Sequence, residues 1–315
     1  MALGNKVKTI YQANQLNMDI FRHFDKQSQA CVMTVGNYDG IHLGHQCLLN
    51  QVIKLAKKDD RQSAVMTFEP HPKEFFNSNT APARIISLRE KLELFEAVGV
   101  ERVHVIRFDS EFAKFTATNF IQILKNNLYV KTLVLGKDFR FGQRRAGDIN
   151  TLKKAGLEID IVDEFLVNNE RVSSSLVREA LAQGNFKKVS ILLGRSYAIS
   201  GKVIHGDKRG REIGFPTANI HMLHERPPLR GVFAVKLDHN LGVANLGIRP
   251  TVGGSSQLNL EVHLFNFSED LYGKHVHVTF LKKIRDEKKF SSIKELKKQI
   301  EIDIKDAKTY LKNYE

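Results

Sequence analysis

The stretch Val35–Leu49, VGNYDGIHLGHQCLL, lies between an apolar run and an amphipathic run and decides how the first part of the chain folds. Before it, residues 30–36 read ACVMTVG, which is typical of a strand. After it, apolar residues recur at helical spacing from about Leu43. In an open α/β sheet, ligands bind at such a strand-to-helix turn, and the N–H groups of a helix N-terminus favour an anion. The stretch is therefore either an ordinary turn or a phosphate site.

The same alternation of short β-branched runs and amphipathic runs continues to Gly184. Further candidate strands occupy residues 62–68, 102–108, 131–136 and 157–163. Candidate helices occupy residues 45–58, 87–99 and 116–128, with Ser87, Thr116 or Thr118 as N-caps and Gly99 as a C-cap. The pattern predicts βαβ units on a parallel sheet, that is, a Rossmann-like α/β domain over residues 1–184. One further helical stretch is expected over residues 174–194.

From Tyr197 onward the pattern changes to short strands with turn residues between them. The six candidate strands occupy residues 197–206, 215–222, 231–238, 241–247, 258–265 and 274–281. They predict a small six-stranded antiparallel β-barrel, closed or nearly closed. Residues 291–314 have helical periodicity and should form one closing helix. A second domain is therefore expected over residues 185–315.

Length and composition narrow the class of protein. The 315 residues exceed what one hydrophobic core usually organises, so two domains are expected. The net charge of +13 comes from 25 basic and 21 acidic residues through Gly184, and 23 and 14 after it. Such an excess favours nucleic acid or nucleotide phosphates as partners. The two cysteines lack disulfide or metal spacing, and no leader or membrane-length apolar run is present, which indicates a cytoplasmic protein without a membrane partner.

The histidines of the opening stretch, His42 and His45, have the spacing H-x-G-H at the expected helix start. They can donate hydrogen bonds to charge that develops on a transferring phosphate. A zinc site is a weaker interpretation, because no third or fourth ligand follows at suitable spacing. Farther along, residues 172–179 read VSSSLVRE, which places serines at a helix start and Arg178 one turn inside. This segment is either a capped helix or a second phosphate-binding arrangement.

The loop over residues 200–220, SGKVIHGDKRGREIGFPTANI, combines glycines with five basic side chains. It is either a flexible basic turn or a phosphate-binding loop, and it is not a Walker A motif. Thr217 and Asn219 are two residues apart on the expected strand, so their oxygens share a face and suit Mg²⁺. Glu261 is a carboxylate within an apolar strand. It either faces solvent or serves as a base for an alcohol.

Four motifs of the first half are similar to the adenylyltransferase half of the bacterial bifunctional riboflavin kinase/FMN adenylyltransferases, or FAD synthetases. They are GNYDGIHLGH (36–45), TFEPHP (67–72), LGKDFRFG (135–142) and VSSSLVR (172–178). The H-x-G-H motif and the S-S-x-x-x-R motif are shared by a wider superfamily of nucleotidyltransferases, and the other two point to flavin. Tyr38 stands where the family usually has Phe, which retains the ring.

The resemblance implies two groups of residues in this half. ATP would be bound by Gly36, Asp39, Gly40, His42, His45, Ser174 and Arg178, with the two histidines catalytic. FMN would be seated by Phe68, Pro70, His71, Asp138 and Phe139. A rigid Pro-His-Pro loop and a core position for Phe139 are the alternatives.

The second half resembles the riboflavin kinase module of the same family. The motifs GREIGFPTANI, GVFAV, GVANLGIRPT, LEVHLFNFSEDLYG and FLKKIRDEKKF follow in the order of that module. The resemblance implies that Glu261 is the catalytic base and that Arg285 belongs to a mobile loop over a flavin at the barrel mouth. It implies an ATP site formed by Gly201, Lys202, Gly214, Thr217 and Asn219, with Thr217 and Asn219 holding Mg²⁺.

The implied function is the two-step synthesis of FAD. Riboflavin and ATP would give FMN in the barrel, and FMN and ATP would give FAD and pyrophosphate in the α/β domain, both with Mg²⁺. The alternatives are an enzyme that retains only one of the activities and a basic nucleic-acid-binding protein. The latter needs a stripe of Lys and Arg with aromatic platforms, whereas the basic residues gather near Lys208 and in the closing helix. Riboflavin, FMN and ATP are therefore the expected partners, without nucleic acid, and the oligomeric state stays open.

Overall fold

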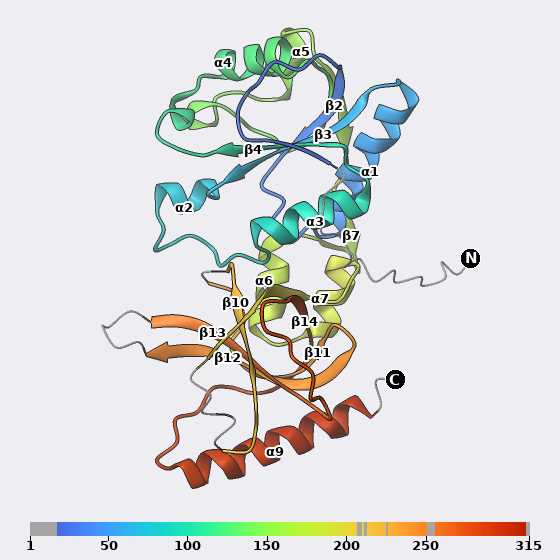
Figure 1. Cartoon of the computed structure of the whole chain (residues 1–315). Coiled ribbons are helices and arrows are strands. Elements are labelled where there is room, and N and C mark those ends of the chain that lie inside the picture. Colours follow the sequence, from blue (N-terminus) through green and yellow to red (C-terminus); the bar gives the residue numbers. More distant parts are fainter. Residues whose placement is uncertain (1–17, 207–209, 211–212, 225, 251–255, 313–315) are drawn as a thin grey trace, which may run out of the picture. The chain divides into compact units, whose positions relative to one another are not determined.

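The computed structural model describes residues 18–206, 210, 213–224, 226–250 and 256–312. The chain divides into two compact units (Figure 1). Of the described residues, those up to Pro82 and Leu88–Ser173 form one unit, here the α/β unit. Ala83–Ser87 and the residues from Ser174 onward form the other, here the barrel unit. The enzyme-domain boundary predicted after Gly184 falls within the barrel unit and stays a prediction.

The α/β unit is built on a parallel sheet of six strands, as the alternating pattern predicted. The strands are β1 (Asp19–Phe21), β2 (Cys31–Val35), β3 (Gln62–Glu69), β4 (Arg102–Arg107), β5 (Val130–Gly136) and β6 (Glu158–Val162). Their order is β1-β4-β3-β2-β5-β6, so the winding reverses between β2 and β5. The opening stretch begins at the carboxyl end of β2, which is the switch point where open sheets bind ligands. The edge strand β1 was not predicted, because three residues show no alternation.

Helices cover both faces of this sheet. They are α1 (Leu43–Lys58), α2 (Pro72–Phe76), α3 (Leu88–Val98), α4 (Ala117–Gln122), a π-helical turn (Ile123–Asn127) and α5 (Ile149–Lys154). On one face, α1 packs through Val52 and Ala56 onto Val32 and Val134. On the other face, Phe120, Leu124 and Leu152 from α4, the π-helical turn and α5 pack onto the alternate residues of β2 and β5. Thr116 caps α4, as one of the predictions had it.

The barrel unit contains the predicted closed antiparallel barrel. Its strands are β9 (Ala198–Ile204), β10 (Ala218–Met222), β11 (Gly231–Leu237), β12 (Asn240–Pro250), β13 (Ser256–Leu264) and β14 (His275–Arg285), in the closed order β10-β13-β12-β11-β14-β9. Inward side chains such as Phe233 and Phe280 are buried. The closing helix α9 (Ile293–Leu311) packs through Ala307 and Leu311 onto the outer face of β11, β12 and β14.

Two local predictions were wrong in detail. The helical stretch expected over residues 174–194 is two helices, α6 (Ser174–Ala182) and α7 (Phe186–Leu193). Gly184 between them has a φ of +68°, a left-handed conformation that ends a helix, and Asn185 caps α7. Thr217 lies one residue before β10 rather than within it. Among the described residues, no helix is long and apolar enough to cross a membrane.

Candidate active sites

His42 begins α1 as its N-cap. Its Nδ1 atom accepts a hydrogen bond from the backbone N–H of His45 at 3.3 Å. A neutral imidazole that accepts at Nδ1 carries its proton on Nε2, which makes Nε2 a donor. The rings of His42 and His45 stack with centroids 3.7 Å apart and an interplanar angle of 19°. The two predicted catalytic histidines therefore lie side by side at the switch point of the sheet.

A tyrosine in the turn before α1, Tyr38, packs against the ring of His45. Tyr38 is buried, its hydroxyl is 2.6 Å from Thr34 Oγ1, and its ring contacts His45 at 5.0 Å between centroids. Burial raises the pKa of Tyr38, so the phenol stays neutral. The ring is a support, and sequence reasoning treated it only as a variation of the motif.

Glycines leave space for the turn and the histidine rings. A Cβ atom on Gly36 would lie 3.1 Å from the Tyr38 ring, and one on Gly44 would lie 3.2 Å from the His42 ring. Gly40 has a φ of +88°, which favours glycine. Asp39 is buried in the same turn. Glycine thus lets the rings pack closely here without displacement, besides the backbone approach to phosphate that the sequence suggested.

The Pro-His-Pro loop is a rigid helix start. His71 caps α2, because its Nδ1 accepts from Lys73 N at 3.1 Å and its own backbone N–H donates to Glu74 Oε2 at 3.1 Å. Pro70 precedes this cap and follows β3, in which Phe68 lies next to last. The cap occupies one ring nitrogen of His71 and positions α2 at the carboxyl end of β3.

Residues before and after this loop join two residues that follow β4 in an aromatic cluster, formed by Phe68, Phe75, Phe76, Phe108 and Phe112. Phe68 contacts Phe112 and Phe108 with centroids 5.5 and 5.9 Å apart. Phe108 contacts Phe75 and Phe76 at 5.5 and 5.7 Å. Phe76 is 69% exposed, which is unusual for a Phe that belongs to a cluster. Only Phe68 was singled out from the sequence, although the pair Phe75–Phe76, which begins three residues after TFEPHP, was a visible signal.

Asp138 and Phe139 lie just after β5. The Phe139 ring stacks on buried Phe141 at 5.8 Å and packs against the core, so part of its role is structural. The Asp138 carboxylate accepts from Arg171 Nη1 at 3.0 Å, and Arg171 also pairs with Glu164 at 2.6 Å. Arg171 lies in β8 (Glu170–Arg171), which forms a small hairpin with β7 (Leu166–Val167). The sequence analysis did not single out Arg171, because this residue lies just outside the VSSSLVR motif, which begins at Val172.

Ser174 and Arg178 lie in α6 of the barrel unit. Arg178 is in the middle of that helix, and its Nε donates to the carbonyl oxygen of Ala83 at 2.7 Å, within the same unit. Their predicted approach to the ATP bound at His42 stays a prediction.

In the barrel, Glu261 and Asn219 face each other in register on β13 and β10. Leu260 and Val262 point into the core, so Glu261 between them lies on the outer face of the barrel. Asn259 Nδ2 donates to Glu261 Oε1 at 2.7 Å and to Asn219 Oδ1 at 3.3 Å. The residues predicted as base and metal ligand therefore come together, joined by an asparagine that the sequence analysis missed.

Two glycines of the loop before β10, Gly206 and Gly210, lie close to the side chains of Asn219 and Thr217. A Cβ atom on Gly206 would lie 2.5 Å from Asn219 Cγ, and one on Gly210 would lie 3.2 Å from Thr217 Oγ1. The predicted ATP ligands Gly201 and Lys202 lie on β9, which pairs with β10. Gly214 has a φ of +91° and open space around its Cα. The part of this loop around Lys208 is outside the described residues.

Arg285 ends β14 and is held by the closing helix. Its Nε and Nη2 donate to the two carboxylate oxygens of Asp303 at 2.8 and 2.7 Å, and its Nη1 donates to Asp286 O at 2.9 Å. Asp303 is buried and also accepts from Gln299. Arg285 is thus the last residue of a strand, anchored to α9, rather than part of a loop. Its predicted contact with flavin stays a prediction.

Comparisons with known proteins agree with both halves. A sequence model of the FAD synthetase family matches residues 24–176, and a model of the riboflavin kinase family matches residues 193–311. The Escherichia coli K12 protein described as a bifunctional riboflavin kinase/FMN adenylyltransferase is 46% identical over 297 residues, covering 90% of this chain and 95% of that protein. The Haemophilus influenzae protein of the same description is 45% identical over 292 residues, covering 90% and 94%.

A solved structure is also similar over nearly the whole chain. It is described as a macrolide-efflux protein from Streptococcus pneumoniae, is 32% identical with a TM-score of 0.75, and the match covers 91% of this chain and 97% of that one. The description concerns that protein, and neither family model that matches this chain describes transport.

Proposed function

The chain belongs to the bifunctional riboflavin kinase/FMN adenylyltransferase family, and from this premise we propose which residues carry each step. The enzyme phosphorylates riboflavin to FMN with ATP and then adenylylates FMN to FAD with release of pyrophosphate. The single observation that carries the residue assignment is the presence of two separate polar constellations, one in each compact unit. They are the stacked His42 and His45 in the α/β unit, and Glu261 with Asn219 in the barrel unit.

In the adenylylation step, an FMN phosphate oxygen attacks the α-phosphorus of ATP and pyrophosphate leaves. We assign His42 Nε2 and the neighbouring His45 ring to the charge that grows on the phosphate oxygens. Donors placed before reaction at a helix N-terminus stabilise such charge without reorganisation. The Gly36–Gly44 turn lets the backbone approach the triphosphate, with Asp39, Gly40, Ser174 and Arg178 as further ATP ligands.

The flavin of this step belongs at the carboxyl end of β3. Phe68, Pro70, His71, Asp138 and Phe139 are the proposed contacts. The exposed faces of the aromatic cluster support this assignment, because a flat flavin ring gains from aromatic contacts. Arg171 extends the proposal by adding a cation beside Asp138.

In the kinase step, the primary alcohol of riboflavin attacks the γ-phosphorus of ATP and ADP leaves. Glu261 is the proposed base, which accepts the hydroxyl proton as the oxygen attacks. Gly201, Lys202 and Gly214 would contact the nucleotide, and Arg285 would contact the flavin.

Mg²⁺ is the proposed metal of the kinase site. Thr217 Oγ1 and Asn219 Oδ1, with the nearby carboxylate of Glu261, offer only oxygen donors, which suits a hard cation. Thr217 and Asn219 would hold the ion, which would neutralise charge on the phosphates when bound. Gly206 leaves space for the Asn219 amide, because a Cβ atom at this position would collide with it.

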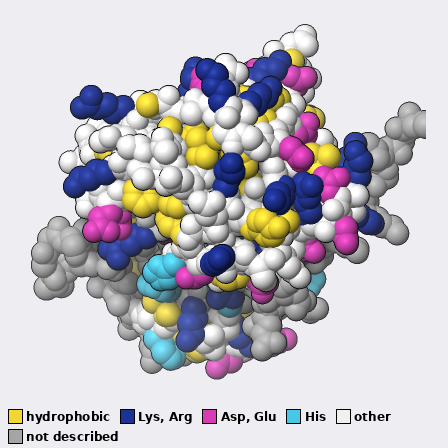
Figure 2. Space-filling model, turned by 90° about the horizontal axis from the view of Figure 1, so that it is seen from above, with side chains coloured by type: hydrophobic (Ala, Val, Ile, Leu, Met, Phe, Trp, Pro, Cys, Tyr) yellow, Lys and Arg dark blue, Asp and Glu magenta, His cyan; other side chains and the backbone are white. Residues whose placement is uncertain are grey.

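The proposed partners are riboflavin, FMN and ATP, in the cytoplasm. Figure 2 shows one face of the molecule, on which Lys and Arg side chains are interspersed with Asp and Glu among the described residues. On this face the described side chains form a mixture of charges, which differs from the basic stripe that a single-stranded nucleic acid follows. Cys31 and Cys47 are free thiols, which is compatible with a reducing compartment.

Incubation of the purified chain with riboflavin and Mg-ATP, followed by chromatography of the flavins, tests this function. FMN is expected first and FAD later. Absence of both products would contradict the proposal. FMN without FAD would restrict the chain to its kinase activity.

A further inference from the structure

The amide of Asn259 is the feature of the kinase site that neither the motifs nor the family assignment explains. Asn259 lies two residues before Glu261 on β13, so both side chains leave the outer face of the barrel. Asn219 lies directly opposite Glu261 on β10. Three polar side chains therefore meet on a face of the barrel whose opposite side is apolar core.

The hydrogen bonds fix which way this amide points. Glu261 Oε1, 2.7 Å from Asn259 Nδ2, belongs to a carboxylate that only accepts when ionised, so the nitrogen of Asn259 must face it. The same NH₂ group has a second hydrogen, which is directed at Asn219 Oδ1 at 3.3 Å. One side chain thus connects the proposed base with the proposed metal ligand.

We propose that Asn259 is a positioning residue of the kinase site: its carboxamide holds one carboxylate oxygen of Glu261 and thereby directs the other oxygen at the attacking hydroxyl. The inference rests on the proposed function of Glu261 as the base. Glu261 Oε1 is the anchored oxygen, and Oε2 is the oxygen assigned to the proton. Atoms balance simply, because the proton passes from the riboflavin hydroxyl to the carboxylate while the O–P bond forms and ADP leaves.

Restraint of the Glu261 side chain by Asn259 is expected to affect the reaction rate, beyond any contribution of Asn259 to packing. A glutamate side chain has three rotatable bonds, and a charge-assisted hydrogen bond restricts them. A reacting group misplaced by about 1 Å can cost about 100-fold in rate. Asn259 also donates a hydrogen bond to Asn219 Oδ1, the oxygen assigned to the cation. A change in the position of Asn259 would therefore affect that oxygen as well.

The test is a series of substitutions at this position, measured by steady-state kinetics of riboflavin phosphorylation. Asn259→Leu keeps a similar size and removes the donor, and we expect kcat to fall about 10-fold to 100-fold. KM for riboflavin should change little, because the flavin contacts are elsewhere. Loss of a donor to the carboxylate favours its protonated form, so the acid limb of the pH–rate profile should move to higher pH.

Two conservative variants sharpen the outcome. Asn259→Gln retains an NH₂ group and should recover part of the lost kcat. Asn259→Asp has the shape of asparagine but places a like charge beside Glu261, and should move the acid limb furthest. The matched control is Asn240→Leu. Asn240 is the first residue of β12 and lies five residues before Asn245, the residue that pairs with Glu261.

Adenylylation of supplied FMN and thermal unfolding are measured on every variant. An Asn259→Leu enzyme with the kcat and pH profile of the wild type would overturn the inference. So would a lower kcat accompanied by a lower melting temperature and an unchanged pH profile, because that is the result of a structural role. Glu261→Gln is measured alongside. If this variant keeps kinase activity, the assignment of Glu261 as the base fails. If it loses kinase activity while the Asn259 variants are unaffected, only the positioning role of Asn259 is contradicted.

Discussion

His42 combines two tasks in a single side chain. Its Nδ1 accepts the N–H of His45 and so caps α1, while its Nε2 is the atom that we assign to a phosphate of ATP. Substitution by alanine would remove both tasks together. A substitution that keeps the cap and removes the imidazole separates them.

His42→Asn is that substitution, because asparagine is among the best N-cap residues. We expect the adenylylation rate to fall about 100-fold or more, the usual effect of removing a donor to developing charge. The free energy of unfolding should stay close to that of the wild type, as measured by urea denaturation. An unchanged adenylylation rate would remove His42 from the site.

Gly206 is a second position of interest, because adding a single Cβ atom there would displace the amide of Asn219. An added Cβ would lie 2.5 Å from Asn219 Cγ and 2.7 Å from Asn219 Oδ1, so the amide must move. Gly206→Ala should therefore lower kcat of riboflavin phosphorylation about 10-fold and raise the Mg²⁺ concentration needed for half-maximal rate. Adenylylation of FMN by the same protein is the control. Equal Mg²⁺ dependence in variant and wild type would contradict the assignment of Asn219.

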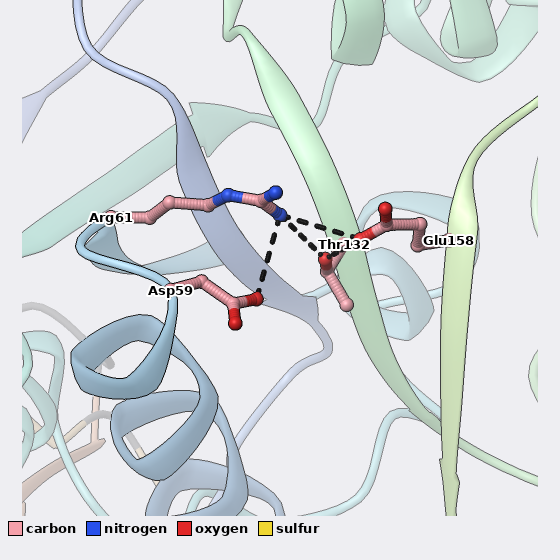
Figure 3. A network of polar contacts seen from close by, with 4 residues as sticks. All are labelled: Asp59, Arg61, Thr132 and Glu158. Atoms are coloured by element: carbon pink, nitrogen blue, oxygen red, sulfur yellow. Dashed lines mark hydrogen bonds and ion pairs between the residues drawn. The ribbon is translucent and has the colours of Figure 1, made fainter.

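At the scale of elements, two arginine networks tie strands to their neighbours with different strength. Arg285 joins β14 to α9 through a bidentate pair with Asp303, whose side chain is only 4% exposed. Figure 3 shows the other network, in which Arg61 Nη1 contacts Thr132 Oγ1 at 3.0 Å, Glu158 Oε2 at 3.3 Å and Asp59 Oδ2 at 3.7 Å.

The two carboxylates of these networks make a matched comparison. Asp303→Asn leaves Arg285 without its buried counter-charge and should lower the free energy of unfolding of the barrel unit by about 3 kcal/mol. Glu158 is 65% exposed, so Glu158→Gln should cost less than about 1 kcal/mol. Urea unfolding followed by circular dichroism measures both. Equal losses for the two variants would show that burial does not set the strength of these pairs.

At the scale of the whole molecule, one buried histidine of the α/β unit, His104, should make the free energy of unfolding depend on pH. His104 on β4 is fully buried, and its ring stacks on Phe21 with centroids 5.1 Å apart. Burial, together with the charge of Arg102, lowers the pKa of His104 from 6.5 to about 4, and the His23 backbone opposes this only weakly. The histidine is therefore neutral in the folded unit at neutral pH.

Stability should fall as the pH drops from about 6.5 to about 4. In that window the unfolded chain binds a proton at His104 and the folded unit does not, so the unfolded state gains up to about 3 kcal/mol. Urea unfolding of wild type and His104→Leu between pH 7.5 and pH 4 isolates this contribution. The variant should show a smaller loss in this range. Identical pH dependence of the two proteins would contradict the buried neutral state.

Much of this architecture was predictable because its signals are local. The segments that form β2 to β6 are short β-branched or apolar runs, the barrel strands are short runs between turn residues, and α1 begins at Leu43 as predicted. The details that could not be predicted depend on contacts distant in sequence. The three residues of β1 form a strand only because β4 pairs with them, and Asn259 acquires its role only beside Asn219 of another strand.

The candidate sites show the same limit. His42 and Glu261 stood out because their motifs are contiguous. The contact of Phe76 with Phe108 and the pairing of Arg171 with Asp138 join segments that only the fold brings together. The anchoring of Arg285 by Asp303 required knowing that α9 lies against the barrel.

The central claim is that two transfers take place at two separate sites of this chain. Its most direct test measures both half-reactions, riboflavin phosphorylation and FMN adenylylation, on the wild type, Glu261→Gln and His42→Asn. Glu261→Gln should lose phosphorylation and keep adenylylation, and His42→Asn should do the reverse. Loss of the same half-reaction in both variants, or of both half-reactions in either folded variant, would contradict the account.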